Sequence, residues 1–161
     1  MNKGRTGFWI AAAWALGTAL LGMALSGLGA IDATVTWYLQ LQKPWFQPPA
    51  WAFGPAWSVI FALSAWAFIR GWAAGGRGAL LAAYFLNGLL NAGWTGLFFG
   101  LRRPDLALYE VIPLWLSILA MLLIARRHDS LAGWLLMPYL LWVSFAGLIN
   151  WEILRLNGPI G

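Results

Sequence analysis

The sequence predicts an all-α fold: a single integral membrane domain, residues 1–161, with five transmembrane helices and a folded first loop. Hydrophobic residues make up 61% of the chain and charged residues only 9%, whereas soluble domains contain roughly 25% charged residues. Five apolar runs reach the ~20 residues that a helix needs to cross a bilayer. The predicted spans are about 7–29, 50–70, 79–101, 105–125 and 131–154.

Charge and cysteine content exclude several classes of function. The net charge is +5, but the basic residues are dispersed near the ends of the apolar runs. This pattern is typical of membrane anchoring and not of a nucleic-acid-binding face. The chain has no cysteine and one histidine, His128, which excludes disulfides, thiolate ligands and multi-histidine metal sites. We therefore predict no metal site and no nucleic-acid partner.

The first apolar run, 7–29, stands where a signal peptide would stand. It is about 23 residues long, whereas the hydrophobic region of a signal peptide has about 7–15 residues. We therefore expect a retained membrane span.

The segment 30–49, between the first two spans, is rich in tryptophan and proline. Trp37 and Tyr38 lie in a pattern with helical spacing, which favours a short helix with one apolar face. Lys43 and Pro44 are expected to end that helix, because the residue before a proline is disfavoured in the helical region.

The same segment re-enters the membrane at Pro48 and Pro49, which suit the first turn of the second span because a missing N–H is harmless there. Non-helical backbone near a membrane must be buried in protein or face water. We therefore expect 30–49 to fold over the mouth of the bundle as a lid. The alternative is an aromatic belt at the membrane interface, where tryptophan is commonly enriched.

The third span carries two different faces. Asn87, Asn91 and Trp94 share one face at i, i+4 and i+7, and we expect this amide face to line an interior cavity. The alternative is that both asparagines only tie helices together. Small residues occupy the opposite side and would let another helix approach closely. This small-residue seam, expected to contact a neighbouring span or a second subunit, comprises Gly88, Ala92, Gly96 and Gly100.

The fifth span is expected to bend at Pro138, one turn before Trp142. Trp142, Ala146 and Ile149 share a face by i+4 and i+3 spacing. A flat indole beside a small alanine forms a slot for a planar ligand, since aromatic faces favour offset stacking. Packing of Trp142 in the core is the alternative.

Two carboxylates lie near or within the spans. Intramembrane carboxylates are costly and are commonly paired or functional. We expect structural pairing for both: Glu152 with Arg155, three residues on, and Glu110 with Arg102 or Arg103.

The first-loop pattern W-Y-x-x-L-x-K-P-x-x-x-P-P resembles the signature of the translocator protein family (TspO/MBR, or peripheral-type benzodiazepine receptors). Bacterial members are called tryptophan-rich sensory proteins. Further matches are F-x-P-x-W at 53–57, N-x-x-W-x-x-x-F-F at 91–99 and P-Y-x-x-W at 138–142. The residues of the first-loop pattern are Trp37, Tyr38, Leu41, Lys43, Pro44, Pro48 and Pro49.

The resemblance implies a membrane receptor that binds porphyrins and related planar hydrophobic ligands, including synthetic isoquinoline and benzodiazepine-type compounds. It implies no required cofactor, with protoporphyrin IX as ligand or substrate. Family members also form homodimers, which favours a dimer through the small-residue seam. The family's pocket-lining positions match Tyr38, Trp57, Asn91, Trp94, Trp142, Ala146 and Ile149.

Two other functions stay open. Bacterial relatives are reported to degrade protoporphyrin IX in light and oxygen, and Trp57 and Trp142 are the candidate catalytic residues, as electron donors or radical sites. A transporter of tetrapyrroles or sterols is the third alternative. The sequence disfavours it, because there is no internal repeat and no coupling carboxylate at mid-span.

Lys43 is the nearest cation for porphyrin carboxylates at the mouth. Leu148, Trp151 and Arg155 approximate a proposed cholesterol motif in which Trp151 replaces the central tyrosine, a departure that weakens the case for a sterol partner. The tryptophan-rich character resembles the bacterial branch, so we expect a multi-pass protein of the bacterial cell envelope.

Overall fold

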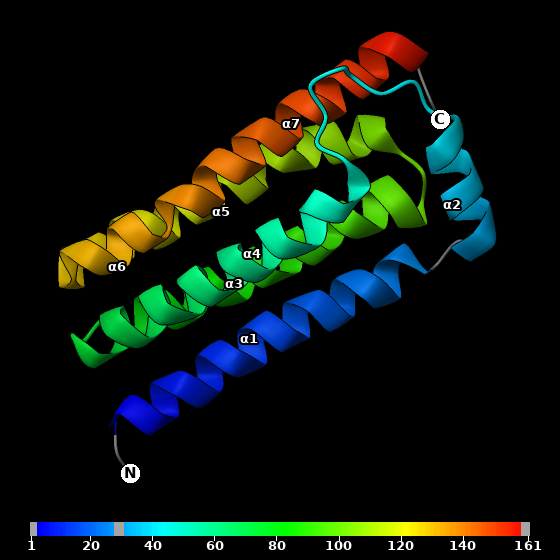
Figure 1. Ribbon diagram of the computed structural model, residues 1–161. Coiled ribbons are helices and arrows are strands. Elements are labelled where there is room, and N and C mark those ends of the chain that lie inside the picture. The colour runs from blue at the N-terminus through cyan, green and yellow to red at the C-terminus, as the bar shows by residue number, and fades with distance from the viewer. Residues whose placement is uncertain (1–2, 28–30, 159–161) are drawn as a thin grey trace.

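The computed structural model describes residues 3–27 and 31–158, and this part of the chain is a helical bundle (Figure 1). Positions 28 and 29 of the first predicted span and position 30 of the lid lie outside the described residues. The elements are α1 (Lys3–Ser26), α2 (Ile31–Gln40), α3 (Ala50–Ala73), α4 (Arg77–Thr95), the π-helical turn η1 (Gly96–Gly100), α5 (Pro104–His128), α6 (Ser130–Leu135) and α7 (Met137–Asn157).

The predicted five-span layout is present as five rods lying side by side, with α2 across one end (Figure 1). α4 continues through η1 as one rod, and α6 and α7 form another. Within the described residues, four stretches are long and apolar enough to cross a membrane by themselves: Gly4–Ser26, Ala50–Ala73, Pro104–His128 and Ser130–Asn157. The rod of α4 is less apolar because it carries Asn87 and Asn91, whose side chains are buried inside the bundle.

The small-residue seam packs against a neighbouring span, α1. A Cβ added at Gly88 would lie 2.7 Å from the Thr18 hydroxyl, and one added at Gly96 would lie 3.0 Å from Leu25. Ala92 between them is fully buried. This face is therefore covered within the chain, and the prediction that it forms a homodimer interface is wrong. Dimerisation through another surface stays a prediction.

The fifth rod is interrupted where Pro138 predicts a bend. α6 ends at Leu135, Leu136 lies between the helices, and Pro138 stands in the first turn of α7, where its missing N–H costs no hydrogen bond. The Asp129 carboxylate caps α6 by accepting a hydrogen bond from the Ala132 N–H at 2.9 Å.

The end of the bundle opposite α2 is closed by an ion pair between rods. The Arg70 guanidinium of α3 donates to both carboxylate oxygens of Asp129, at 3.2 and 2.8 Å. Gly75, with φ of 105°, turns the chain between α3 and α4, a conformation that favours glycine. His128 lies against Gly76 at this end, far from α2.

The lid begins with a helix, as predicted, but the helix ends at Gln40, earlier than Lys43 and Pro44. The reason is a tertiary contact: the Gln42 N–H donates to the Asn157 side chain, and its carbonyl accepts from the same amide, both at 2.8 Å. Those bonds replace helical ones. The predicted re-entry is confirmed, since Pro49 immediately precedes α3.

Candidate ligand-binding cavity

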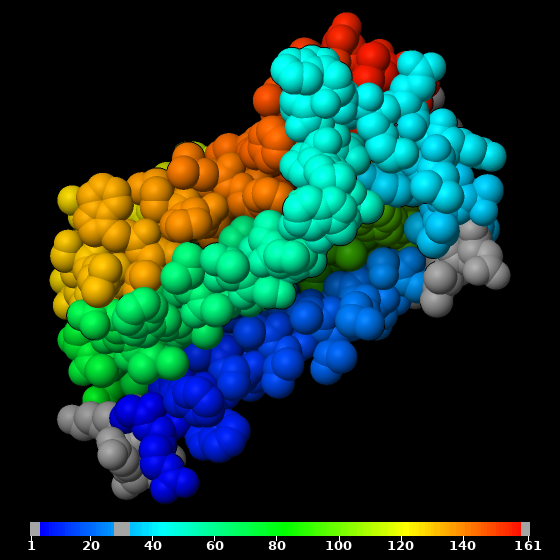
Figure 2. Space-filling view, in the orientation of Figure 1, coloured from blue at the N-terminus to red at the C-terminus, as the bar shows by residue number. Residues whose placement is uncertain are grey.

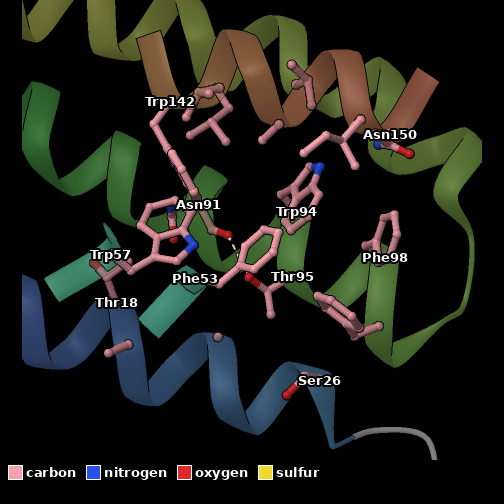
Figure 3. A pocket seen from close by; sticks show the side chains of 18 of the residues that line it. Thr18, Ser26, Phe53, Trp57, Asn91, Trp94, Thr95, Phe98, Trp142 and Asn150 are labelled. Carbon is pink, nitrogen blue, oxygen red and sulfur yellow. Dashed lines mark hydrogen bonds between the residues drawn. The ribbon is translucent and has the colours of Figure 1, made fainter. Parts of the chain in front are cut away.

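A cavity of about 440 Å³ lies beneath the lid, between the halves of the rods nearest α2. Figure 3 shows α1 on one side of it and α7 on the other, with side chains from α3 and α4 between them. Figure 2 shows the lid and the start of α3, in cyan, folded over this end of the molecule. The volume is within the range of about 300–1,000 Å³ typical of small-molecule sites.

One wall is built by aromatic rings of α3 and α7. Trp57 and Trp142 meet edge to face with ring centroids 6.4 Å apart, and Phe53 lies 5.7 Å from Trp142. All three line the cavity. Edge-to-face packing leaves parts of the ring faces uncovered, and these faces are suitable for stacking against a planar molecule.

The wall nearest the lid combines α4, η1 and α2. Trp94 stacks on Phe98 with centroids 5.1 Å apart, and Tyr38 of α2 packs on Phe99 at 5.5 Å. The π-helical turn presents Phe98 and Phe99, which are adjacent in sequence, to one cavity. π-turns are frequently found at functional sites.

Few polar groups reach the cavity. Asn91 lines it and donates its side-chain N–H to the Tyr139 hydroxyl at 2.9 Å. Its backbone carbonyl accepts from the Thr95 hydroxyl at 3.2 Å (Figure 3). Asn87 is fully buried and donates to Ser117 of α5 at 2.9 Å, so it ties helices together and does not line the cavity.

Comparison with known proteins identifies the family of this chain. The model of the TspO/MBR family matches residues 11–156. The chain belongs to the TspO/MBR family. A tryptophan-rich sensory protein of Cereibacter sphaeroides is 38% identical over 129 residues, which cover 80% of this chain and 82% of the relative. A translocator protein of Sus scrofa is 32% identical over 143 residues, covering 85% and 84%.

The seven positions that the family resemblance assigns to ligand binding all lie on the cavity wall. Trp57 comes from α3, Asn91 and Trp94 from α4, and Tyr38 from α2. The remaining three positions, on α7, are Trp142, Ala146 and Ile149. The fold thus brings four elements to one space, and contact of these residues with a ligand stays a prediction.

None of the residues predicted for the lid lines the cavity, but two of them, Trp37 and Lys43, contact residues of its wall. Trp37 packs edge to face on Phe98 with centroids 5.9 Å apart. The ammonium of Lys43 lies 4.6 Å from the centroid of the Tyr38 ring, a cation–π contact. Pro44 is buried, Pro48 is half-buried and Pro49 is exposed.

Tyr38 joins the lid to the cavity. Its hydroxyl accepts a hydrogen bond from the Gln47 amide at 3.1 Å. Burial raises the pKa of the Tyr38 hydroxyl above its usual value, an effect that the bond from Gln47 partly offsets. The phenol is therefore neutral at physiological pH and keeps its O–H as a donor.

Two tryptophans in and next to the lid have the exposure expected of an aromatic belt at the membrane interface, and two others have the burial expected of a lid over the bundle. Trp45 is 95% exposed and Trp51 is 76% exposed, as expected of an interfacial aromatic belt. Trp37 and Trp57 are half-buried and belong to the lid packing and the cavity wall. The same stretch of chain thus directs Trp45 and Trp51 outward and Trp37 and Trp57 toward the interior of the bundle.

The residues of the sterol-like motif lie on the outside of α7. Leu148 and Trp151 are about half exposed, and neither lines the cavity. Arg155 donates to Glu152 at 2.8 Å, so the predicted pairing of Glu152 is confirmed. This surface faces away from the cavity, and a lipid or sterol partner stays a prediction.

The predicted pairing of Glu110 is wrong. Arg103 instead donates to Asp105 at 2.8 Å, because a carboxylate two residues away is nearer than one on the next turns of α5. Neither carboxylate oxygen of Glu110 has a hydrogen-bond partner among the described residues.

Sequence reasoning missed the wall that α1 supplies. The residues concerned are Thr18, Ala19, Gly22, Met23 and Ser26. α1 is apolar on nearly every side, so periodicity does not distinguish its cavity face from its lipid face. The available signal was Gly22 together with the small-residue seam of α4: a Cβ at Gly22 would lie 3.6 Å from Thr95.

Proposed function

We propose that this chain is a membrane receptor or sensor that binds porphyrins and related planar hydrophobic ligands in the cavity beneath the lid. The observation that carries the proposal is the set of three indoles, Trp57, Trp94 and Trp142, on the wall of a single apolar cavity. Indole faces stack on flat conjugated rings. The names of relatives, tryptophan-rich sensory protein and translocator protein, support a role in sensing or ligand handling.

The position of Lys43 supports porphyrins among planar ligands. Porphyrins such as protoporphyrin IX carry carboxylates at one edge, and these would stay near water while the ring enters the cavity. The Lys43 ammonium lies above Tyr38, a residue of the cavity wall. A cation at the mouth therefore complements the polar edge of the ligand.

Titration of the purified protein with protoporphyrin IX in darkness tests the proposal. Tryptophan emission should be quenched saturably with a micromolar dissociation constant, because three indoles would contact or closely approach the ring. An excess of a synthetic isoquinoline-type ligand should restore the emission. Absence of quenching at micromolar porphyrin removes the proposal.

The contact between Trp57 and Trp142 favours a second candidate, light-dependent degradation of the porphyrin. An excited porphyrin beside an indole can exchange an electron with it. The ring of Tyr139 also packs on Trp57, with centroids 6.0 Å apart, and extends this group of aromatic rings. In this case a new absorbing species appears only with both illumination and oxygen. Saturable binding without such a product supports the receptor alone.

Transport of the bound ligand is tested separately. Proteoliposomes loaded with a porphyrin acceptor should show no protein-dependent flux if the chain is a receptor. Fractionation of a bacterial host is expected to place the protein in the cell envelope, because relatives occur in bacteria and four stretches of the described residues are apolar and long enough to cross a membrane.

A further inference from the structure

The formal charges of the chain are divided unevenly between the two halves of the bundle (Figure 1). The half nearest α2 has no net charge, because it carries four residues of each sign: Lys43, Arg102, Arg103 and Arg155 with Asp32, Asp105, Glu110 and Glu152. The opposite half carries one acid, Asp129, and six basic residues, which we name the basic end: Lys3, Arg5, Arg70, Arg77, Arg126 and Arg127. The whole net charge of +5 therefore lies at the basic end.

Ion pairs neutralise charges near the lid but leave most of the basic end unpaired. Near the lid, two of the four basic residues pair with acids. At the basic end Arg70 binds Asp129, the single acid there. The other arginines of this end have no ion pair among the described residues, and their side chains are exposed: Arg5, Arg77, Arg126 and Arg127.

Three elements bring part of the basic end together. Arg77 begins α4, and the preceding Gly76 packs on His128 at the end of α5, where an added Cβ would lie 2.5 Å from the imidazole ring. Gly133 of α6 packs on Arg126, and a Cβ added there would lie 2.6 Å from the Arg126 Cβ. The start of α4, the last turn of α5 and α6 therefore form one continuous surface.

Helix stability accounts for only part of this charge. Arg126 and Arg127 lie in the last turn of α5, where the helix macrodipole favours cations. Arg5 and Arg77 lie in the first turns of α1 and α4, where the same dipole disfavours them. Since no acid pairs with these two within the described residues, their positions favour an anion from outside the chain.

Exposed apolar side chains lie beside the charges. Trp134 of α6 is 56% exposed, and the Arg126 guanidinium lies 5.6 Å from the centroid of its ring. Leu123 and Leu131, on α5 and α6, are also exposed. Tryptophan and arginine at the end of a membrane span are typical of the interface with water. The basic end is therefore at the depth of the lipid headgroups, with apolar surface next to it.

We propose that the basic end binds the headgroups of acidic phospholipids, whose acyl chains lie against the adjoining apolar rods. A phosphate oxygen accepts charge-assisted hydrogen bonds from a guanidinium, and basic clusters beside membrane spans attract acidic lipids. A soluble anion has no apolar part to meet Trp134 and its neighbours. This inference goes beyond the proposed function and does not depend on it, because the cavity lies in the other half of the bundle.

Native mass spectrometry of the protein in detergent measures the binding of single lipids. The wild type should bind the first phosphatidylglycerol about 5- to 25-fold more tightly than the first phosphatidylcholine, because each basic side chain at a membrane surface contributes about 5-fold. The double variant Arg77→Gln with Arg127→Gln should lower that preference by at least about 5-fold. Both side chains are exposed and unpaired within the described residues, so the fold should be kept, which helical circular dichroism checks.

The matched control removes two positive charges from the half nearest α2. Arg102→Gln with Arg103→Gln has the same net charge as the first double variant and should keep the wild-type preference. If the first double variant does not fold, Arg77→Gln alone provides the test and should lower the preference about 2- to 5-fold.

Two results would overturn the proposal: equal affinity of the wild type for the two lipids, or equal losses of preference in the two double variants. An excess of glycerol 3-phosphate or of a short polyaspartate peptide should leave the bound phosphatidylglycerol in place. Displacement by either would assign the surface to a soluble anion and overturn the proposal as well. Titration of the same samples with protoporphyrin IX tests the proposed function separately, so the failure of either one leaves the other standing.

Discussion

The close approach of α1 to α4 depends on Gly88, and the substitution Gly88→Ala tests it. The added methyl group would lie 2.7 Å from the Thr18 hydroxyl and 3.2 Å from the Trp14 indole nitrogen. Ordinary contacts of this kind begin near 3.4 Å, so α1 must retreat by several tenths of an ångström. Thr18 is β-branched and buried, which leaves it little rotamer freedom to absorb the change.

The expected cost follows from two opposing effects. Overpacking a tight contact costs about 1–3 kcal/mol, whereas replacing a helical glycine by alanine gains up to ~1 kcal/mol in helix propensity. Gly93, on the same helix, has no atom within 4 Å of an added Cβ. Gly93→Ala therefore gains the propensity without the clash, and the two variants should differ by about 1–3 kcal/mol in unfolding free energy.

Thermal unfolding in detergent, followed by helical circular dichroism, compares the two variants under one set of conditions. Gly88→Ala should also weaken ligand binding, because α1 supplies the cavity wall at Thr18 and Gly22. Equal midpoints for Gly88→Ala and Gly93→Ala would show that α1 does not press on α4 at this point. The assignment of the small-residue seam to an intrachain contact would then be wrong.

Three further changes test the cavity, the lid and the closed end of the bundle. Trp142→Phe should weaken protoporphyrin binding about 2- to 10-fold by reducing the stacking surface. The control Trp9→Phe changes an exposed side chain of α1 and should leave binding unchanged. Titration of both variants decides, and equal affinities would contradict the cavity assignment. Asn157→Ala removes the two 2.8 Å hydrogen bonds to the lid. A loss of ~1 kcal/mol should speed ligand release about 5-fold in a stopped-flow dissociation experiment. An unchanged rate would mean that the lid does not limit release. Hydrogen bonds from Arg70 hold the pKa of Asp129 below its usual value. The pair therefore stabilises the fold fully at pH values above the usual aspartate pKa of about 3.9. This contribution is lost as the pH falls through the lowered pKa. Melting midpoints between pH 7 and 3 should fall for the wild type and fall less for Asp129→Asn, from a lower start, and parallel curves would contradict the assignment.

The sequence by itself determined the helical rods and the positions at which proline starts or interrupts them. Apolar length sets where helices cross the membrane, and proline acts through its own ring and its missing N–H. The start of α3 after Pro49 and the break before Pro138 were therefore predictable from local chemistry. The two faces of α4 were predictable as well, because helical spacing alone separates Asn91 from Gly88.

Only the tertiary structure decided what those faces meet. Glycine spacing on α4 permits a close neighbour but does not name it, and α1 was the neighbour rather than a second subunit. The end of α2 was set by Gln42 and Asn157, which are 115 residues apart, so no local pattern contains it. Glu110 shows the same limit, since the guanidinium expected to pair with it bonds Asp105 instead.

Part of the cavity wall could be predicted from the sequence, and part was decided only by the tertiary structure. The positions on α3, α4 and α7 carry periodicity and motif signals, because amides and indoles stand out against apolar spans. The wall from α1 carries no such signal, since a helix that faces lipid on one side and a cavity on the other is apolar on both. The buried hydrogen bonds that join Asn91 to Tyr139, Tyr139 to Asn87 and Asn87 to Ser117 are likewise a tertiary property, because they link side chains of three separate rods.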